Sequence, residues 1–254
     1  MRILVIGGTG LIGSRVVGRL RQGGHEVIAA APSTGVNTVT GDGLFEAMEG
    51  VDVVVDVANS PSFDSAVAWD FFFASGNNVF AAERASGVKL HVALSVVGTD
   101  QLQDSGYFRA KQLQEQLVEE SDVPFTILRA TQFFEFLGGV AGFSTGQDQI
   151  VRLPPALMQP VAADDVGETL AQLAVGPPAN GRFELAGPET YRLSDVVGRV
   201  LEVSHDERLV VSDPTAKYFG VSIGERTLVP VSEHPFIGYV SLDSWLARNQ
   251  SRAA

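Results

Sequence analysis

The sequence contains no cysteine, which excludes disulfide bonds, zinc–thiolate sites, cysteine-ligated iron–sulfur clusters and thiol catalysis. Histidine is scarce too, and the four that occur (His25, His91, His205 and His234) do not have the spacing of metal ligands. We therefore expect no metal site. No apolar run approaches the roughly 20 residues that span a bilayer. The first residues lead straight into a strand, so we expect no signal peptide.

Positive charge is also in deficit, because 18 Lys and Arg stand against 30 Asp and Glu, for a net charge of −12. Nucleic acid and anionic membranes bind clustered positive charge, so we expect neither as a partner. Hydrophobic residues make up 45% of the 254 residues, which is enough for a large core. These features predict a cytoplasmic globular protein that is a monomer or a homodimer and binds small molecules.

Short β-branched runs alternate with helical stretches through the first half of the chain. Apolar strands separated by helices are typical of a parallel sheet covered on both faces. Right-handed crossovers then give a doubly wound α/β fold of the Rossmann type. The expected strands are 3–6, 26–30, 52–57, 90–97, 124–129 and 183–185, and the expected helices are 11–22, 44–49, one within 69–86, 107–120, one from 165 toward 175 and one from 194 toward 201.

The pattern changes after about residue 133, where glycine, proline and aromatic residues mix. We expect residues 1–133 and 161–185 to form the dinucleotide-binding domain, and residues 134–160 and 186–254 to form a smaller substrate region whose tail is loop-rich. Asp164 and Asp165 are interpreted as helix-start residues, with Asp165 opening a capping box, and Ser194 as a helix cap. His91 opens a strand and is expected at a surface or an edge.

A glycine-rich segment joins the first expected strand to the first expected helix and reads Gly-Gly-Thr-Gly-Leu-Ile-Gly. It contains G-x-G-x-x-G, in which glycine permits a tight turn and a close approach of the backbone to a pyrophosphate. The free N–H groups at the helix start would bind that pyrophosphate. The alternative is a glycine-rich turn that holds no ligand. The predicted contact residues are Gly7, Thr9, Gly10, Leu11, Ile12 and Gly13.

The segment after the second strand leads us to predict NADP(H) in preference to NAD(H). NAD enzymes of this type usually carry an acidic residue there for the ribose hydroxyls, whereas this segment reads Ala-Ala-Ala-Pro-Ser-Thr. Ser33 and Thr34 offer donors to a 2′-phosphate, although an ordinary polar turn explains them equally well. Asp42 is placed either to meet the adenine amino group or to start the next helix.

Tyr107 and Lys111 lie four residues apart on one face of an expected helix, and Ser95 lies near the end of the preceding strand. A phenol with a pKa near ~10 is a poor acid at neutral pH, and a nearby ammonium group lowers that pKa. We predict that Tyr107 donates a proton, that Lys111 lowers its pKa and binds the nicotinamide ribose, and that Ser95 orients the substrate oxygen. The alternative is an ordinary amphipathic helix with a half-buried tyrosine and a lysine reaching to solvent.

Together these segments resemble the atypical short-chain dehydrogenases/reductases of the NmrA-like, NAD(P)H-binding branch. The resemblance implies a Rossmann fold with a small C-terminal substrate region. It also implies that Val57, Ala58, Asn59 and the segment after Arg129, including Thr131, border the nicotinamide nucleotide. Many relatives have an arginine after the second strand, where this chain has Ala-Pro. The matching segments are Gly7–Gly13, Gly41–Leu44, Val92–Ser95, Tyr107–Lys111, Arg129–Phe134 and Gln159–Val166.

Many NmrA-like relatives lack the tyrosine, so its presence with Ser95 and Lys111 favours an active enzyme. We predict an NAD(P)H-dependent oxidoreductase acting on a carbonyl-type or quinone small molecule, with Gln132 and Phe133 near the ligand because they follow the last major strand. Two rivals stay open. One is a non-catalytic NADP(H)-binding redox sensor of the NmrA type, and the other is an enzyme that epimerises, or reduces quinones or flavins, without Tyr107.

Overall fold

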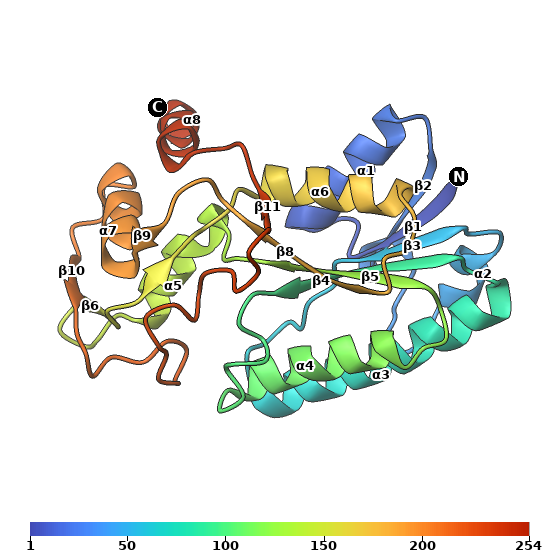
Figure 1. Cartoon of the computed structure of the whole chain (residues 1–254), viewed down its shortest axis with the longest axis horizontal. Helices are drawn as coiled ribbons and strands as arrows, with labels where there is room; N and C mark the ends of the chain where they lie inside the picture. The colour runs from blue at the N-terminus through green and yellow to red at the C-terminus, as the bar shows by residue number, and fades with distance from the viewer. Residues whose placement is uncertain (254) are drawn as a thin grey trace. The chain divides into compact units, whose positions relative to one another are not determined.

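The structure is a computed structural model that describes residues 1–253, with side chains described for residues 1–250. It contains two compact units, Met1–Arg129 with Val166–Phe183 and Ala130–Asp165 with Glu184–Ala254. The central sheet has seven parallel strands in the order β11-β8-β5-β4-β3-β1-β2 (Figure 1). These strands are β1 (Arg2–Ile6), β2 (Glu26–Ala30), β3 (Val53–Asp56), β4 (Leu90–Val96), β5 (Phe125–Ala130), β8 (Gly181–Ala186) and β11 (Phe236–Ile237).

Helices cover both faces of the sheet in the first unit. On one face, α1 and α6 lie together, because Arg19 of α1 pairs with Glu168 of α6 at 2.5 Å. On the other face, α3 and α4 run side by side (Figure 1). The predicted doubly wound fold is therefore confirmed. The helices of this unit are α1 (Leu11–Gln22), η1 (Pro32–Thr34), α2 (Leu44–Met48), α3 (Ser65–Ser86), α4 (Gly106–Glu119) and α6 (Ala163–Val175), whose first three residues belong to the second unit.

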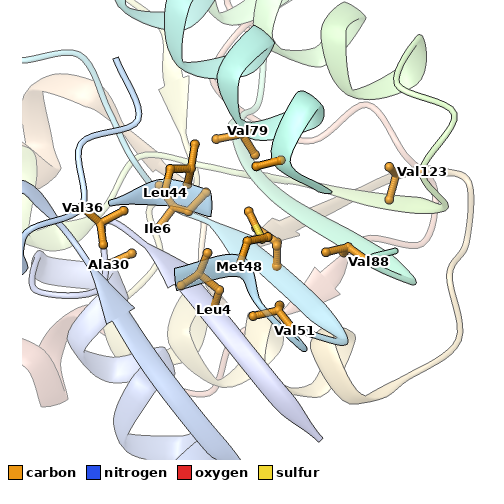
Figure 2. Packing of buried hydrophobic residues seen from close by; sticks show 12 residues of the cluster. Leu4, Ile6, Ala30, Val36, Leu44, Met48, Val51, Val79, Val88 and Val123 are labelled. Atoms are coloured by element: carbon orange, nitrogen blue, oxygen red, sulfur yellow. The ribbon is translucent and has the colours of Figure 1, made fainter. Parts of the chain in front are cut away.

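A hydrophobic core lies between the sheet and the helices α2 and α3 (Figure 2). Leu4 and Val54 come from the continuous apolar runs of β1 and β3, and both are fully buried. Leu44 and Met48 are one helical turn apart on α2 and are buried against them. Strands apolar at every position form here because both faces of the sheet are covered.

The second unit carries short strands and helices. The strands β6 and β10 pair in parallel, and β7 and β9 pair antiparallel. No helix in the described part of the chain has the length and apolar character needed to cross a membrane. The elements are η2 (Phe134–Phe136), α5 (Leu137–Phe143), β6 (Ile150–Leu153), β7 (Leu157–Met158), β9 (Tyr191–Arg192), α7 (Leu193–Val203), β10 (Leu209–Ser212) and α8 (Leu242–Ala253).

Two helix predictions were wrong in detail. Asp164 and Asp165 lie in the first turn of α6, as expected, but the helix begins at Ala163, so Asp165 does not open a capping box. Its carboxylate instead accepts a hydrogen bond from the N–H of Val240 at 3.0 Å. Ser194 is not a cap, because α7 begins at Leu193 with Arg192 as its N-cap. The tail between α7 and α8 is loop-rich, as predicted, and the helix α8 at its end was not predicted.

The placement of His91 was also predicted wrongly. Its strand, β4, lies between β3 and β5 inside the sheet, and its side chain is fully buried. The ring Nδ1 meets Glu83 Oε1 of α3 at 2.6 Å, so a buried carboxylate partners the imidazole. The sequence offered no sign of this pair, since the residues of α3 buried around Glu83 are apolar except for Ser75.

Candidate nucleotide and proton-transfer site

The order of the sheet reverses at β1, because β2 lies on one side of it and β3 on the other. Ligands of doubly wound sheets bind beyond the carboxyl ends of the strands at such a point. Gly7 follows β1 there, and Val57–Asn59 follows β3. The two segments are in contact, since a Cβ atom added to Gly7 would lie 3.0 Å from the Ala58 nitrogen.

The geometry of the glycine loop requires glycine. Gly7 has φ of +77°, a left-handed conformation that strains other residues. A Cβ on Gly8 would lie 2.7 Å from Ala29 Cα, and a Cβ on Gly13 would lie 2.1 Å from the Gly7 carbonyl oxygen. The first turn of α1 therefore rests directly on the loop, with no room for any side chain between them.

The start of α1 is suited to an anion. The N-cap, Gly10, has no side chain to satisfy the first N–H groups, and its own N–H donates to the Gly7 carbonyl at 2.9 Å. The N–H groups of Leu11–Gly13 have no acceptor within the helix, and no acidic residue lies in the first turn. Positive potential and free donors together fit a pyrophosphate. Thr9 is exposed beside them.

The segment after β2 forms a tight turn. The Thr34 hydroxyl faces the carbonyls of Ala29 and Ala31 at 2.9 Å each, so its single hydrogen closes this turn. Ser33 is exposed. Asp42 is exposed too and accepts from the Thr40 hydroxyl at 2.6 Å; it does not cap α2, whose N-cap is Gly43. Residues 29–42 contain no Lys or Arg, so the donors available here are hydroxyl groups, the Asn37 side-chain amide and backbone N–H groups.

Tyr107 lies in the first turn of α4 and donates its phenolic hydrogen to Asn59 Oδ1 at 2.9 Å. The ring of Phe63 packs edge-on against the Tyr107 ring, with centroids 4.9 Å apart. Burial raises the pKa of Tyr107 to about 12. With its pKa raised by burial, Tyr107 is a neutral phenol with a proton to give, and the role of Lys111 toward it stays a prediction.

Lys111 is buried one turn further along α4. Its ammonium group donates to the Leu94 carbonyl at 2.9 Å and to the Gln114 side chain, and it lies 4.9 Å from the Phe72 ring centroid. Burial lowers the pKa of Lys111 to about 8, while the charges of Asp56 and Glu115 oppose that shift. The alternative of a lysine that reaches to solvent is excluded, because Lys111 is buried. Lysine is almost never fully buried unless it is paired.

Ser95 does not point its hydroxyl to a substrate position. It donates to Glu115 Oε1 of α4 at 2.5 Å. The same buried carboxylate accepts from Arg129 at 2.9 and 2.7 Å and pairs with Arg182 at 3.2 Å. Because a serine hydroxyl has one hydrogen, this placement removes the support for Ser95 as the group that orients the substrate oxygen. Sequence reasoning missed the partner, Glu115.

Two further residues of the site were not singled out from the sequence. Asp56 Oδ1 accepts from the Ala58 N–H at 2.9 Å, and its other oxygen is 3.4 Å from Gln114 Nε2. Gln114 therefore contacts both Lys111 and Asp56, the last residue of β3. The spacing of three residues between Lys111 and Gln114 on one helix was the signal that could have revealed this contact.

Thr131 and Gln132 follow β5 in the second unit. Thr131 is buried and donates its hydroxyl hydrogen to the Gln159 carbonyl at 2.6 Å. Gln132 is buried as well, and Phe133 pairs with Val161 through a β-bridge. No group of three or more potential metal-ligand side chains occurs among the described residues.

The family model described as NAD(P)H-binding matches residues 7–176. A (4-alkanoyl-5-oxo-2,5-dihydrofuran-3-yl)methyl phosphate reductase from Streptomyces griseus is 30% identical over 224 residues, covering 78% of this chain and 75% of the relative. The photosystem II assembly factor Ycf39 from Cyanophora paradoxa is 24% identical over 233 residues, covering 85% of this chain and 73% of the relative.

Solved structures share the fold. A short-chain dehydrogenase/reductase superfamily protein from Agrobacterium tumefaciens with bound NAD has a TM-score of 0.75 at 19% identity, covering 100% of this chain and 97% of the other. An NADPH-dependent quinone oxidoreductase from Escherichia coli with bound NADPH has a TM-score of 0.68 at 17% identity, covering 98% and 99%. Because the family model covers residues 7–176, which include the glycine loop and the segment from Tyr107 to Lys111, the chain belongs to the NAD(P)H-binding family.

Proposed function

We propose that this protein is an NAD(P)H-dependent reductase of carbonyl-type or quinone small molecules, and that it uses Tyr107 and Lys111 for proton transfer. The observation that carries the proposal is the buried ammonium group of Lys111, one helical turn from a phenol beside the segment that follows β3. Burying a charged lysine is unfavourable unless the ammonium group is paired or hydrogen-bonded. The carbonyl class is supported by the Streptomyces relative, whose named substrate carries alkanoyl and oxo groups.

The chain's own groups have distinct roles in this proposal. When bound, a reduced nicotinamide would supply the hydride that the carbonyl carbon accepts. Tyr107 gives its proton to the carbonyl oxygen, so the product is an alcohol, and the phenolate left behind regains a proton from solvent. Lys111 stabilises that phenolate by its charge and offers a donor to the ribose. The loop Gly7–Gly13 holds the pyrophosphate.

We propose NADPH rather than NADH as the preferred nucleotide. The end of β2 lacks the acidic residue that would repel a 2′-phosphate, and residues 29–42 carry no acid before Asp42. The exposed Ser33 hydroxyl and nearby backbone N–H groups are the donors in this proposal, and Val57–Asn59 border the nucleotide. Titration of the purified protein with each nucleotide, followed by fluorescence, tests the preference. Equal or tighter binding of NADH would contradict it.

We assign substrate selection to residues 134–160 and 186–254, and the nucleotide to residues 1–133 and 161–185. With a net charge of −12, the protein would repel nucleic acid, so the proposed partner is a small molecule. We further propose that it acts in the cytoplasm as a monomer or homodimer.

The test of catalysis is the consumption of NADPH or NADH with menadione and benzaldehyde as probe acceptors, comparing the wild type with Tyr107→Phe. A general acid contributes about 10²–10⁴ in rate, so we expect Tyr107→Phe to lower kcat by about 10² or more while the nucleotide dissociation constant stays unchanged. Turnover that survives this substitution would refute the role of Tyr107 and favour a reduction or epimerisation that does not need a phenol.

A non-catalytic function is the second candidate, favoured by the similarity to the assembly factor Ycf39. In that case the protein would bind nucleotide without turning over any acceptor and would differ in conformation between the oxidised and reduced nucleotide. Limited proteolysis in the presence of NADP⁺ and NADPH distinguishes the two candidates, because a sensor would give different cleavage patterns with the two.

A further inference from the structure

The proposed reaction calls for a second hydrogen-bond donor to the substrate oxygen, and the residue predicted from the sequence for this role does not supply it in the structure. Negative charge develops on the substrate oxygen as hydride arrives, and such an oxygen needs a second hydrogen-bond donor beside the phenol. Ser95 was expected to supply it, but its hydrogen is directed to Glu115 at 2.5 Å inside a buried network of arginines and carboxylates. Another donor is needed near the Tyr107 hydroxyl.

Asn59 occupies the required place. Its Oδ1 lies 2.9 Å from the Tyr107 hydroxyl, at the carboxyl end of β3 where ligands of this fold bind. The side chain is held in one orientation, because the N–H of Ser60 also donates to Oδ1 at 3.0 Å. A backbone N–H can only donate, so the atom it meets is the amide oxygen and the other atom of the amide is the NH₂ group.

That NH₂ group is available. Asn59 is exposed, and among residues 1–250 its Nδ2 has no hydrogen-bond partner. Nδ2 and Oδ1 are attached to the same carbon, so Nδ2 lies beside the phenol, and a single oxygen atom can accept from both Nδ2 and the Tyr107 hydroxyl. Asn59 also directly follows Ala58, which touches Gly7 of the nucleotide loop.

We infer that Asn59 is a catalytic residue of the proposed reduction, and that its side-chain NH₂ donates to the substrate oxygen in the role that the sequence analysis predicted for Ser95. In the resting protein, Asn59 Oδ1 holds the Tyr107 hydrogen. When a carbonyl substrate binds, its oxygen replaces Oδ1 as the acceptor of that hydrogen and takes the second hydrogen bond from Nδ2. The inference rests on the proposed function, since it assumes that Tyr107 is the proton donor.

The decisive variants are Asn59→Ala and Asn59→Asp. The aspartate keeps the shape of the side chain and the acceptor for Ser60 and Tyr107, but it removes the NH₂ donor. A residue that only supports the loop would tolerate Asn59→Asp, whereas a donor to the substrate would not. Ser95→Ala tests the competing assignment, and Ser62→Ala is a loop control, because Ser62 accepts from the Asp64 N–H on the same segment.

With menadione or benzaldehyde as acceptor, we expect both Asn59 variants to lower kcat on the order of 10², the loss seen when one donor to a developing oxyanion is removed. Ser95→Ala and Ser62→Ala should stay within a few-fold of the wild type. Nitrophenolate binding to the protein with oxidised nucleotide gives a readout without turnover, since this anion accepts from the same donors. Its dissociation constant should rise about tenfold in the Asn59 variants and not in Ser95→Ala.

Full activity and unchanged nitrophenolate binding in Asn59→Asp would overturn the inference, as would a loss in Ser95→Ala larger than that in Asn59→Ala. A different result would contradict the proposed function itself. If Tyr107→Phe retains turnover, the proton donor is wrong, whereas an inactive Tyr107→Phe beside an active Asn59→Asp removes only the assignment of Asn59.

Discussion

Two glycines of α1 allow a matched test of the nucleotide loop. Gly13 and Gly18 lie in the same helix, yet a Cβ at Gly13 would lie 2.1 Å from the Gly7 carbonyl oxygen, while a Cβ at Gly18 would have nothing within 4 Å. Ordinary contact begins near 3.4 Å, so Gly13→Ala forces the loop and the helix apart by about 1.3 Å. The obstacle is backbone, and no side chain can rotate out of the way.

Overpacking of this kind costs about 1–3 kcal/mol, and in Gly13→Ala the strain falls on the groups proposed to hold the pyrophosphate. We therefore expect Gly13→Ala to unfold at lower urea concentration and to bind NADPH at least about tenfold more weakly, which corresponds to ~1.4 kcal/mol. Gly18→Ala should gain about 0.5–1 kcal/mol of stability, because alanine is the better helix former, and should bind NADPH as the wild type does.

Urea unfolding followed by far-UV circular dichroism measures the first effect, and fluorescence titration with NADPH measures the second. The circular dichroism spectrum in the absence of urea shows whether Gly13→Ala is folded before its binding is compared. If folded Gly13→Ala bound NADPH within twofold of Gly18→Ala, the loop would not be the pyrophosphate site, and the argument from the glycine geometry would fail.

Two further predictions concern buried titratable groups. His91→Leu leaves Glu83 buried and unpaired and should lower the free energy of unfolding by about 3–5 kcal/mol. The double variant with His91→Leu and Glu83→Leu should lose less stability than His91→Leu alone. Urea unfolding in which the double variant loses the sum of the two single losses would contradict this. Burial disfavours the charged imidazole, but Glu83 and Asp56 outweigh burial and raise the pKa of His91. The free energy of unfolding of the wild type should therefore fall as pH rises from about 6.5 through the folded-state pKa. The double variant should lack this pH dependence. Since burial lowers the pKa of Lys111 to about 8, kcat should fall as pH rises through that value and the ammonium loses its charge; a flat profile would contradict the role of Lys111.

Several features could be predicted from the sequence because they depend on neighbouring residues. The helix Leu11–Gln22 and the strand Glu26–Ala30 have the bounds that the hydrophobic periodicity predicts. Helix starts were less accurate. The helix α3 begins at Ser65 because the Asp64 carboxylate accepts from the N–H groups of Ala66 and Val67, a cap that the sequence pattern did not single out.

The environment of each polar side chain was not predictable in the same way. Ser95, Tyr107 and Lys111 were chosen by spacing, and spacing alone cannot tell which neighbour takes a hydrogen bond. Glu115 takes the hydrogen of Ser95, and Asn59 takes that of Tyr107, across 20 and 48 residues of sequence. Burial then sets the ionisation, because it raises the pKa of Tyr107 and keeps the phenol neutral.

The sequence by itself therefore determined the parallel sheet and the glycine loop, because hydrophobic periodicity and the conformational freedom of glycine act over a few residues. Only the tertiary structure decided that His91 is buried, that Ser95 belongs to a buried ion network and that Asn59 faces the phenol. These outcomes depend on which strands become neighbours and which helix faces meet them. Hydrogen bonds and desolvation between residues far apart in the chain arise only once the sheet has formed.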